Sequence, residues 1–296
     1  MSLIYQRVTE RAQALEVLED RGAAAVPLAG GTDVMPGIRA GRYPEGVIVD
    51  ITRVDELREM SLSGGSAVIG SLVTAAELAR SPQVDEALPS LAAAARSLGS
   101  PQVRARATVG GNVANASPAA DLLVALTALE AGVSLASHRG ERTLPIDTFM
   151  LAPGLTRRAP DELILGFRIP LRDGARTAFT KVGLRRALAC ALVNLAMTVM
   201  PSPDGRSCTE ASIALGAVAP TCLRARRAER LLVGREVDAE LVSAVARAAA
   251  EETAPLSDIR GSAAYRRHLV SVHVERALLE LFPSHGSAST NGRGEV

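Results

Sequence analysis

Two glycine pairs, each followed by short polar side chains, are the residues of this chain best suited to binding a phosphorylated ligand. The first lies in Ala29–Asp33 (AGGTD), and the second is Gly110-Gly111, in a segment that ends at Asp121. Glycine has no Cβ, so a Gly-Gly step can adopt positive φ values and lets a ligand approach the backbone amides closely. Side chains such as Thr32 and Asn112 are good partners for hydroxyl and phosphate groups. We therefore predict that the two segments together form a cradle for a diphosphate.

The Ser117-Pro118 step predicts the start of a helix directly after the second glycine pair. Serine is a preferred N-cap and proline a preferred first-turn residue, so we expect a helix over residues 119–131 that ends at Gly132. The unpaired N–H groups and the positive dipole end of this helix would favour a phosphate group.

No residue set typical of a catalytic or metal site accompanies these segments. The sequence has no GxSxG motif, no cysteine beside a histidine, no GxGxxG after a strand and no GxxxxGK loop. The three cysteines are too far apart for a CxxC pair, and the four histidines lack HExxH or comparable spacing, so no metal or iron–sulfur site is expected. We therefore expect a bound cofactor to supply the chemistry.

Length and charge indicate a two-domain cytoplasmic protein. A chain of 296 residues is longer than most domains with a single hydrophobic core. A net charge of +1 gives no reason to expect nucleic acid or an anionic membrane as partner. Residues 1–30 lack the pattern of a signal peptide, and no apolar run reaches the length of a membrane span. The chain has an odd number of cysteines, and in this compartment we expect them to be reduced thiols.

The order of the expected elements indicates an α+β architecture with a hinge near residues 170–176, where Pro, Asp and Gly cluster. Before the hinge, helices and short strands alternate, and a hairpin is expected over 133–137 and 141–146. After it, strands at 177–184, 190–200 and 208–218 predict an antiparallel meander. Helices are expected over 224–233, 239–252 and 263–281. Residues 284–296, rich in Ser, Gly and Asn, are expected to be disordered.

The sequence resembles one known family over residues 3–282, nearly the whole chain. The residues that carry the resemblance are AGGTD and the block SPQVRARATVGGNVANASPAAD, supported by DITRVDEL, IGSLVT and GAVAPT. They resemble the FAD-binding medium subunit of the molybdenum hydroxylases, a group that includes xanthine dehydrogenase, aldehyde oxidoreductase and carbon monoxide dehydrogenase. The TVGGN-to-PAAD block is the specific part of this signal.

The resemblance implies a fold and a division into domains. Residues 1–172 would form an FAD-binding domain of the vanillyl-alcohol-oxidase-like type, with two subdomains. Residues 173–283 would form a C-terminal domain with a three-stranded antiparallel sheet packed with helices, and 284–296 would be a disordered tail.

The resemblance also implies which residues hold a non-covalent FAD. Polar atoms of the cofactor would be bound by the two glycine segments and the helix start, Leu98 and Leu165 would pack on the cofactor, and Lys181 would reach it from the C-terminal domain. The full set is Ala29, Gly30, Gly31, Thr32, Asp33, Leu98, Thr108, Gly110, Gly111, Asn112, Ser117, Asp121, Leu165 and Lys181. Aromatic residues make up 2% of the chain, and Phe149 and Phe179 are the candidates for screening a flavin face.

The function implied is electron transfer within a multi-subunit molybdenum hydroxylase. The molybdenum cofactor would lie on a large subunit and the 2Fe-2S clusters on a small subunit, in a dimer of heterotrimers. Electrons would pass from those clusters to the flavin on this chain and then to an external acceptor.

Two alternatives stay open from the residues. The chain would be a stand-alone FAD oxidase or reductase of the same fold if it had its own substrate pocket. It would be a nucleotide-binding or assembly subunit if it had no redox activity, and in that case the purified protein would not be yellow.

Overall fold

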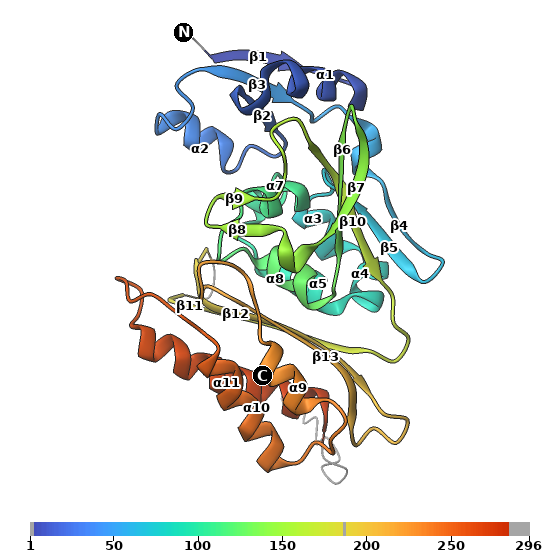
Figure 1. The fold of residues 1–296 in the computed structure, drawn as a ribbon, viewed down its shortest axis with the longest axis vertical. Helices are drawn as coiled ribbons and strands as arrows, with labels where there is room; N and C mark the ends of the chain where they lie inside the picture. Colours follow the sequence, from blue (N-terminus) through green and yellow to red (C-terminus); the bar gives the residue numbers. More distant parts are fainter. Residues whose placement is uncertain (1–2, 186–187, 284–296) are drawn as a thin grey trace, which may run out of the picture.

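The computed structural model describes residues 3–185 and 188–283, and these form three parts stacked along the long axis of the molecule (Figure 1). The N-terminal part is a parallel sheet of order β1-β3-β2 with helices beside it, and the middle part is a five-stranded antiparallel sheet with a group of short helices. The C-terminal part is an antiparallel sheet with three helices on the face away from the middle part. The predicted α+β class is confirmed.

The N-terminal part places the first glycine segment at the end of a strand. Its elements are β1 (Leu3–Arg7), α1 (Arg11–Arg21), β2 (Ala25–Leu28), α2 (Val34–Arg39) and β3 (Gly46–Asp50). The apolar run in β3 fits its central position, where both neighbours pair with it in parallel register. Ala29–Asp33 therefore connects the carboxyl end of β2 to α2, and the residues after β3 emerge at the same edge of the sheet.

The middle part is a sheet of order β4-β5-β10-β6-β7. Its strands are β4 (Met60–Ser63), β5 (Ser66–Gly70), β6 (Gly132–Ser137), β7 (Gly140–Pro145) and β10 (Leu163–Pro170), and a two-stranded ribbon, β8 (Met150–Ala152) with β9 (Leu155–Thr156), lies beside it. Strands β6 and β7 form the predicted hairpin.

Short helices fill the space between this sheet and the C-terminal part. They are α3 (Ala75–Arg80), α4 (Pro82–Ala87), α5 (Pro89–Ser97), α6 (Pro101–Arg104), α7 (Val109–Ala114) and α8 (Asp121–Ala128). Three of them begin with proline at the first position, where the missing N–H costs nothing, and α4 and α6 are capped by Ser81 and Ser100. Every residue of α8 is buried, and this helix packs against α5, β12 and β13.

The C-terminal part contains the predicted meander, extended by one strand. The long strands are β11 (Arg176–Gly183), β12 (Ala191–Pro201) and β13 (Cys208–Gly216), and the two-residue β14 (Leu223–Arg224) makes the sheet four-stranded. Helices α9 (Arg226–Leu232), α10 (Ala239–Glu251) and α11 (Ala263–Leu281) follow. Strand β12 is almost entirely buried because α8 covers one face of it and α11 the other. The expected disorder of residues 284–296 lies outside the described residues.

Candidate cofactor-binding site

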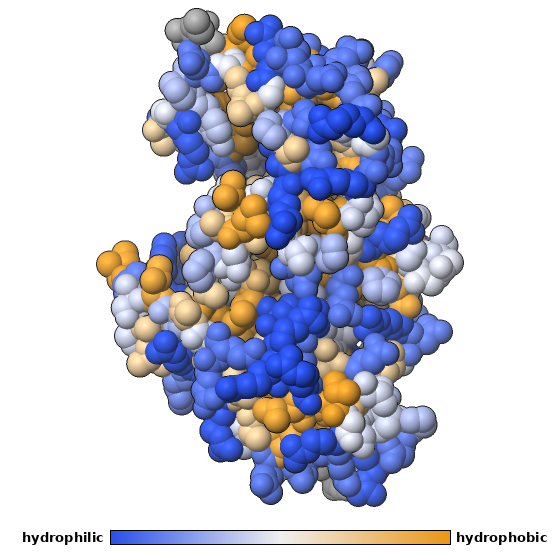
Figure 2. Space-filling view, in the orientation of Figure 1, coloured by the Kyte–Doolittle hydropathy of each residue, from blue (hydrophilic) through white to orange (hydrophobic). Residues whose placement is uncertain are grey.

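A cavity of about 930 Å³ lies between the N-terminal and middle parts, and both glycine segments line it. The first contributes residues from Ala29 to Val34, and the second contributes Thr108, Gly110 and Gly111, followed by residues 114–118. Strand β2, the β8–β9 ribbon and the start of β10 form further walls. Figure 2 shows the molecular surface hollowed between these two parts. Segments about 80 residues apart in sequence thus line one cavity.

The first glycine segment presents unpaired backbone donors to this cavity. Within the described parts of the chain, the N–H groups of residues 30–33 make no hydrogen bond to a backbone or side-chain acceptor. Gly31 has φ +75°, a conformation that favours glycine. A Cβ on Gly30 would lie 1.8 Å from the carbonyl oxygen of Arg106, so glycine is required for the close approach of the two segments. Successive free backbone donors are the groups with which proteins bind diphosphate oxygens.

The second glycine pair lies in the short helix α7, not in an open loop. Neither Gly110 nor Gly111 has a positive φ, so backbone freedom does not explain the pair. A Cβ on Gly110 would lie 2.6 Å from the Cβ of Ser71, whereas a Cβ on Gly111 would meet only the Thr108 hydroxyl, at 3.0 Å. Gly110 therefore allows the helix to pack on β5 and its continuation, and Gly111 keeps the cavity open.

The hydroxyl of Ser71 supports a polar ligand in this cavity. It is buried, it lines the cavity, and it has no hydrogen-bond partner among the described residues. A buried polar atom without a partner costs free energy on the order of 1–3 kcal/mol, which a bound acceptor would remove. The free N–H groups and this hydroxyl together fit a ligand with several phosphate and hydroxyl oxygens.

A buried ion pair joins the middle part to the C-terminal sheet. Lys181 Nζ on β11 lies 2.5 Å from Asp121 Oδ2 at the start of α8, and it also donates to Ser97 O at 3.3 Å. Asn194 on β12 donates to the other Asp121 oxygen at 2.9 Å and to Ala119 O at 3.3 Å. Burial raises the pKa of the Asp121 carboxyl, and the charge and hydrogen bond of Lys181 oppose that rise. This network fixes the position of α8 relative to the sheet.

Two family models together match almost the whole chain. The first, described as the FAD binding domain in molybdopterin dehydrogenase, matches residues 1–172, and the second, the CO dehydrogenase flavoprotein C-terminal domain, matches residues 178–281. The chain belongs to this family of FAD-binding subunits.

Relatives and solved structures of this family agree with that assignment. The glyceraldehyde dehydrogenase medium chain of Sulfolobus acidocaldarius is 32% identical over 94% of this chain and 97% of its own length. The carbon monoxide dehydrogenase medium chain of Hydrogenophaga pseudoflava is 34% identical over 90% of this chain and 92% of its own length. Solved structures of carbon monoxide dehydrogenase from H. pseudoflava and of quinoline 2-oxidoreductase from Pseudomonas putida 86 are similar to this chain over most of its length.

The H. pseudoflava structure has a TM-score of 0.89 at 34% identity and covers 94% of this chain and 96% of the matched chain. The P. putida structure has a TM-score of 0.88 at 29% identity, and the match covers 95% of this chain and 97% of the matched chain. The predicted family, the fold, the oxidoreductase class and FAD as cofactor are thereby confirmed.

In this FAD-binding subunit, five of the predicted site residues do not line the cavity. Asp121 and Lys181 are engaged with each other at the sheet, and Leu98 is buried at the end of α5. The side-chain oxygen of Asn112 accepts from the N–H of Leu123 at 3.3 Å and so caps α8 from a neighbouring helix. Leu165 is half-buried in β10 and packs on the N-terminal core. Their contact with FAD remains a prediction.

The start of the helix after the second glycine pair was predicted wrongly. Helix α8 begins at Asp121, its N-cap is Ala120, and the Ser117 hydroxyl instead accepts from the N–H of Ala119 at 3.3 Å. The carbonyl of Pro118 accepts from Ala217 N at 2.7 Å, so a contact with the C-terminal part holds residues 117–120 in a turn. The N-cap expected at Ser117 is therefore displaced by three residues, to Ala120, while Ser117 itself still lines the cavity.

The two proposed aromatic residues differ in their surroundings. Phe149 is completely buried in the core of the middle part, so it has no face available to a flavin. Phe179 is half-buried on β11 and packs on the same core.

Several residues that line the cavity were missed by the sequence analysis. Tyr43 follows α2 and is the one aromatic residue in the described lining, and Arg158 and Glu162 lie before β10. Burial lowers the pKa of the Arg158 guanidinium, which donates to the carbonyl of Glu162 at 2.6 Å. No local pattern marks these positions, because they reach the cavity only through the packing of β2, α2 and β10.

Proposed function

We propose that this chain is the electron-transfer subunit of a molybdenum hydroxylase complex. It would take electrons from 2Fe-2S clusters on a small subunit and pass them to an external acceptor, while substrate is hydroxylated at a molybdenum cofactor on a large subunit. When bound, FAD supplies the ability to accept electrons singly and release them in pairs. The observation that carries the proposal is the single cavity built from two glycine segments with free backbone donors.

The chain's own residues would bind and orient FAD in this arrangement. The N–H groups of residues 30–33 and the hydroxyl of Ser71 would hold phosphate and ribityl oxygens, and Gly111 would leave room for them. Asn115 Nδ2 donates to Asp33 Oδ1 at 3.2 Å and would keep the two segments together around the ligand. Leu98, Asp121 and Lys181 do not line this cavity, and their contact with FAD is proposed from the family resemblance alone.

We further propose that residues 1–172 are the FAD-binding domain and 173–283 the C-terminal domain, in a cytoplasmic dimer of heterotrimers. The names of the relatives support a complex, since they are called medium chains or subunits. The chain itself has no group of three or more His, Cys, Asp or Glu, within the described ranges, placed to hold a metal. No helix among the same residues has the length and apolarity needed to cross a bilayer.

The test is reduction of the flavin with and without partner subunits. The purified yellow chain is mixed anaerobically with candidate heterocycles, aldehydes or carbon monoxide, and the flavin absorbance is followed. We expect no bleaching by the chain alone and bleaching by the right substrate after the large and small subunits are added. Bleaching by a substrate without partners would instead identify a stand-alone oxidase or reductase, and a colourless protein that takes up no FAD would identify an assembly subunit.

A further inference from the structure

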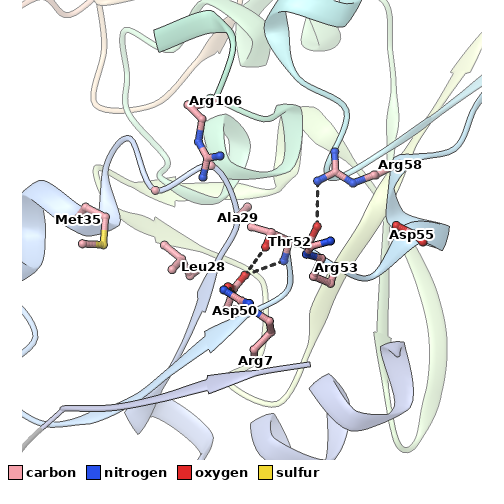
Figure 3. A pocket seen from close by; sticks show the side chains of 12 residues that line it. Arg7, Leu28, Ala29, Met35, Asp50, Thr52, Arg53, Asp55, Arg58 and Arg106 are labelled. Atoms are coloured by element: carbon pink, nitrogen blue, oxygen red, sulfur yellow. Dashed lines mark hydrogen bonds and ion pairs between the residues drawn. The ribbon is translucent and has the colours of Figure 1, made fainter. Parts of the chain in front are cut away.

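A second cavity, of about 520 Å³, lies beside the first glycine segment and is lined by four arginines. Arg7 comes from the end of β1, Arg53 and Arg58 follow β3, and Arg106 precedes α7. Figure 3 shows their guanidinium groups around one space, with Leu28 and Ala29 on its wall. Residues 29–31 line both this cavity and the larger one. The two cavities are therefore neighbours that share a backbone wall.

The floor of the second cavity is a fixed hydrogen-bond network centred on Asp50. Its carboxylate accepts from Thr52 Oγ1 at 2.6 Å, from the Tyr5 hydroxyl, and from Arg7 Nε at 3.2 Å. Arg58 Nη2 in turn donates to the carbonyl of Thr52 at 2.9 Å. Two of the four guanidinium groups are thus held in place by the protein, and the carboxylate nearest to them is fully engaged.

The other two guanidinium groups are free. Neither Arg53 nor Arg106 makes a side-chain hydrogen bond or ion pair with any residue in the described ranges. Asp50 and Asp55 are the acidic residues of the lining, so four positive charges face two negative ones. All four arginines are solvent-exposed, so a dissolved anion can reach their guanidinium groups, and the arginine fork binds phosphate and carboxylate oxygens in pairs.

We propose that this cavity is a second ligand site, separate from the FAD site, that binds a small molecule with two or more oxyanion groups. The volume is far larger than one phosphate requires, which is why we infer a multivalent ligand. Arg7 and Arg58 would provide a preset positive surface, and Arg53 and Arg106 would close on the ligand. A free phosphate compound and a polycarboxylate present the same chemistry to these groups.

The test measures anion binding by calorimetry on the full chain loaded with FAD, so that the FAD cradle is already filled. Inorganic pyrophosphate, orthophosphate and citrate are the probes, at low salt because exposed charge interactions are screened. We expect pyrophosphate or citrate to bind more tightly than orthophosphate, and the stronger of the two identifies the preferred oxyanion. Arg53→Gln and Arg106→Gln should each weaken binding about tenfold, as expected for loss of a charged hydrogen bond.

The matched control is Arg247→Gln, an exposed arginine on α10, a helix that lies at the opposite end of the molecule from β1 and β3 (Figure 1). It should leave anion binding unchanged, and all three variants should keep the flavin content of the unmodified chain. Absence of binding by every probe, or binding that survives the Arg53→Gln/Arg106→Gln double variant, would overturn the proposal. Binding to the isolated chain that disappears in the assembled complex would also overturn it, because the arginines would then be covered by a partner subunit.

Discussion

Gly110 and Gly111 are adjacent in the sequence but face different surroundings. A Cβ at Gly110 would enter the space of Ser71, and a Cβ at Gly111 would enter the cavity. The same substitution is therefore expected to damage packing at one position and ligand binding at the other.

We predict that Gly111→Val folds but binds FAD about tenfold more weakly, because the side chain would enter the cavity that both glycine segments line. Gly110→Ala, in contrast, should lower the free energy of unfolding by about 1–3 kcal/mol through overpacking against Ser71. Flavin fluorescence titration and urea unfolding separate the two effects. A Gly111→Val chain with its full flavin content would show that this helix does not border the cofactor.

Asp50 is expected to stabilise the fold in a pH-dependent way. Burial alone would raise the pKa of its carboxyl, but the hydrogen bonds from Thr52, Tyr5 and Arg7 outweigh burial and lower it from 3.8 to about 2. A depressed pKa means that the folded state favours the ionised form, so the stabilisation is present above pH 3.8 and is lost as pH falls toward about 2. This stabilisation of the folded state amounts to about 2 kcal/mol.

We therefore predict that Asp50→Asn lowers the free energy of unfolding by about 2 kcal/mol at pH 7. The difference from the unmodified chain should stay constant down to about pH 5 and narrow between pH 4 and 3 in urea titrations. The control is Asp173→Asn, at an exposed turn position, which should change stability by less than about 0.5 kcal/mol. A difference that does not depend on pH would show that the ionised form of Asp50 has no special role.

At the scale of elements, strand register explains how the ion pair at α8 is positioned. Lys181 on β11, Asn194 on β12 and Gly216 on β13 are direct neighbours across the sheet. A Cβ at Gly216 would lie 2.1 Å from Asn194 Oδ1, so glycine makes room for the Asn194 side chain. That side chain then reaches Asp121 and Ala119 at the start of α8.

We predict that Asn194→Leu destabilises the chain by about 1–3 kcal/mol, because Asp121 loses a donor while it stays buried. The contact between α8 and the sheet should loosen, and the FAD dissociation rate should rise. The control on the same strand is Thr198→Val, since the Thr198 hydroxyl is buried and has no partner among the described residues. That variant should be as stable as the unmodified chain, or slightly more stable, in thermal unfolding. An equal loss of stability in both variants would argue against a specific role for Asn194.

Elements with local signals could be predicted from the sequence, and those fixed by distant contacts could not. The hairpin of β6 and β7 and the meander of β11 to β13 follow from alternation and turn residues. The start of α8 does not follow from local sequence. The N–H of Ala217 donates to the turn before the helix, and the side chain of Asn112, on α7, caps α8. Similarly, Ser71 and Tyr43 come to line the same cavity only after the N-terminal and middle parts have packed together.

At the scale of the whole molecule, the large cavity is formed where separate parts meet, and its lining determines how FAD is attached. Covalent flavin linkage requires a nucleophilic side chain at the ring, most often His or Cys. None of the described residues that line the cavity is His or Cys. Cys208 and Cys222 are buried in the C-terminal part, where burial raises their thiol pKa values to about 11 and about 12.

We therefore predict that FAD is bound without a covalent bond and is released when the parts separate. Acid precipitation unfolds the chain and removes the cavity, so the yellow colour should appear in the supernatant and the protein pellet should be colourless. Chromatography of the supernatant should give intact FAD, and adding it to refolded chain should restore the flavin absorbance. The control is the same treatment of a flavoprotein with a known covalent link, whose pellet stays yellow. A yellow pellet from this chain would contradict the prediction, because it would show that a side chain is bonded to the flavin.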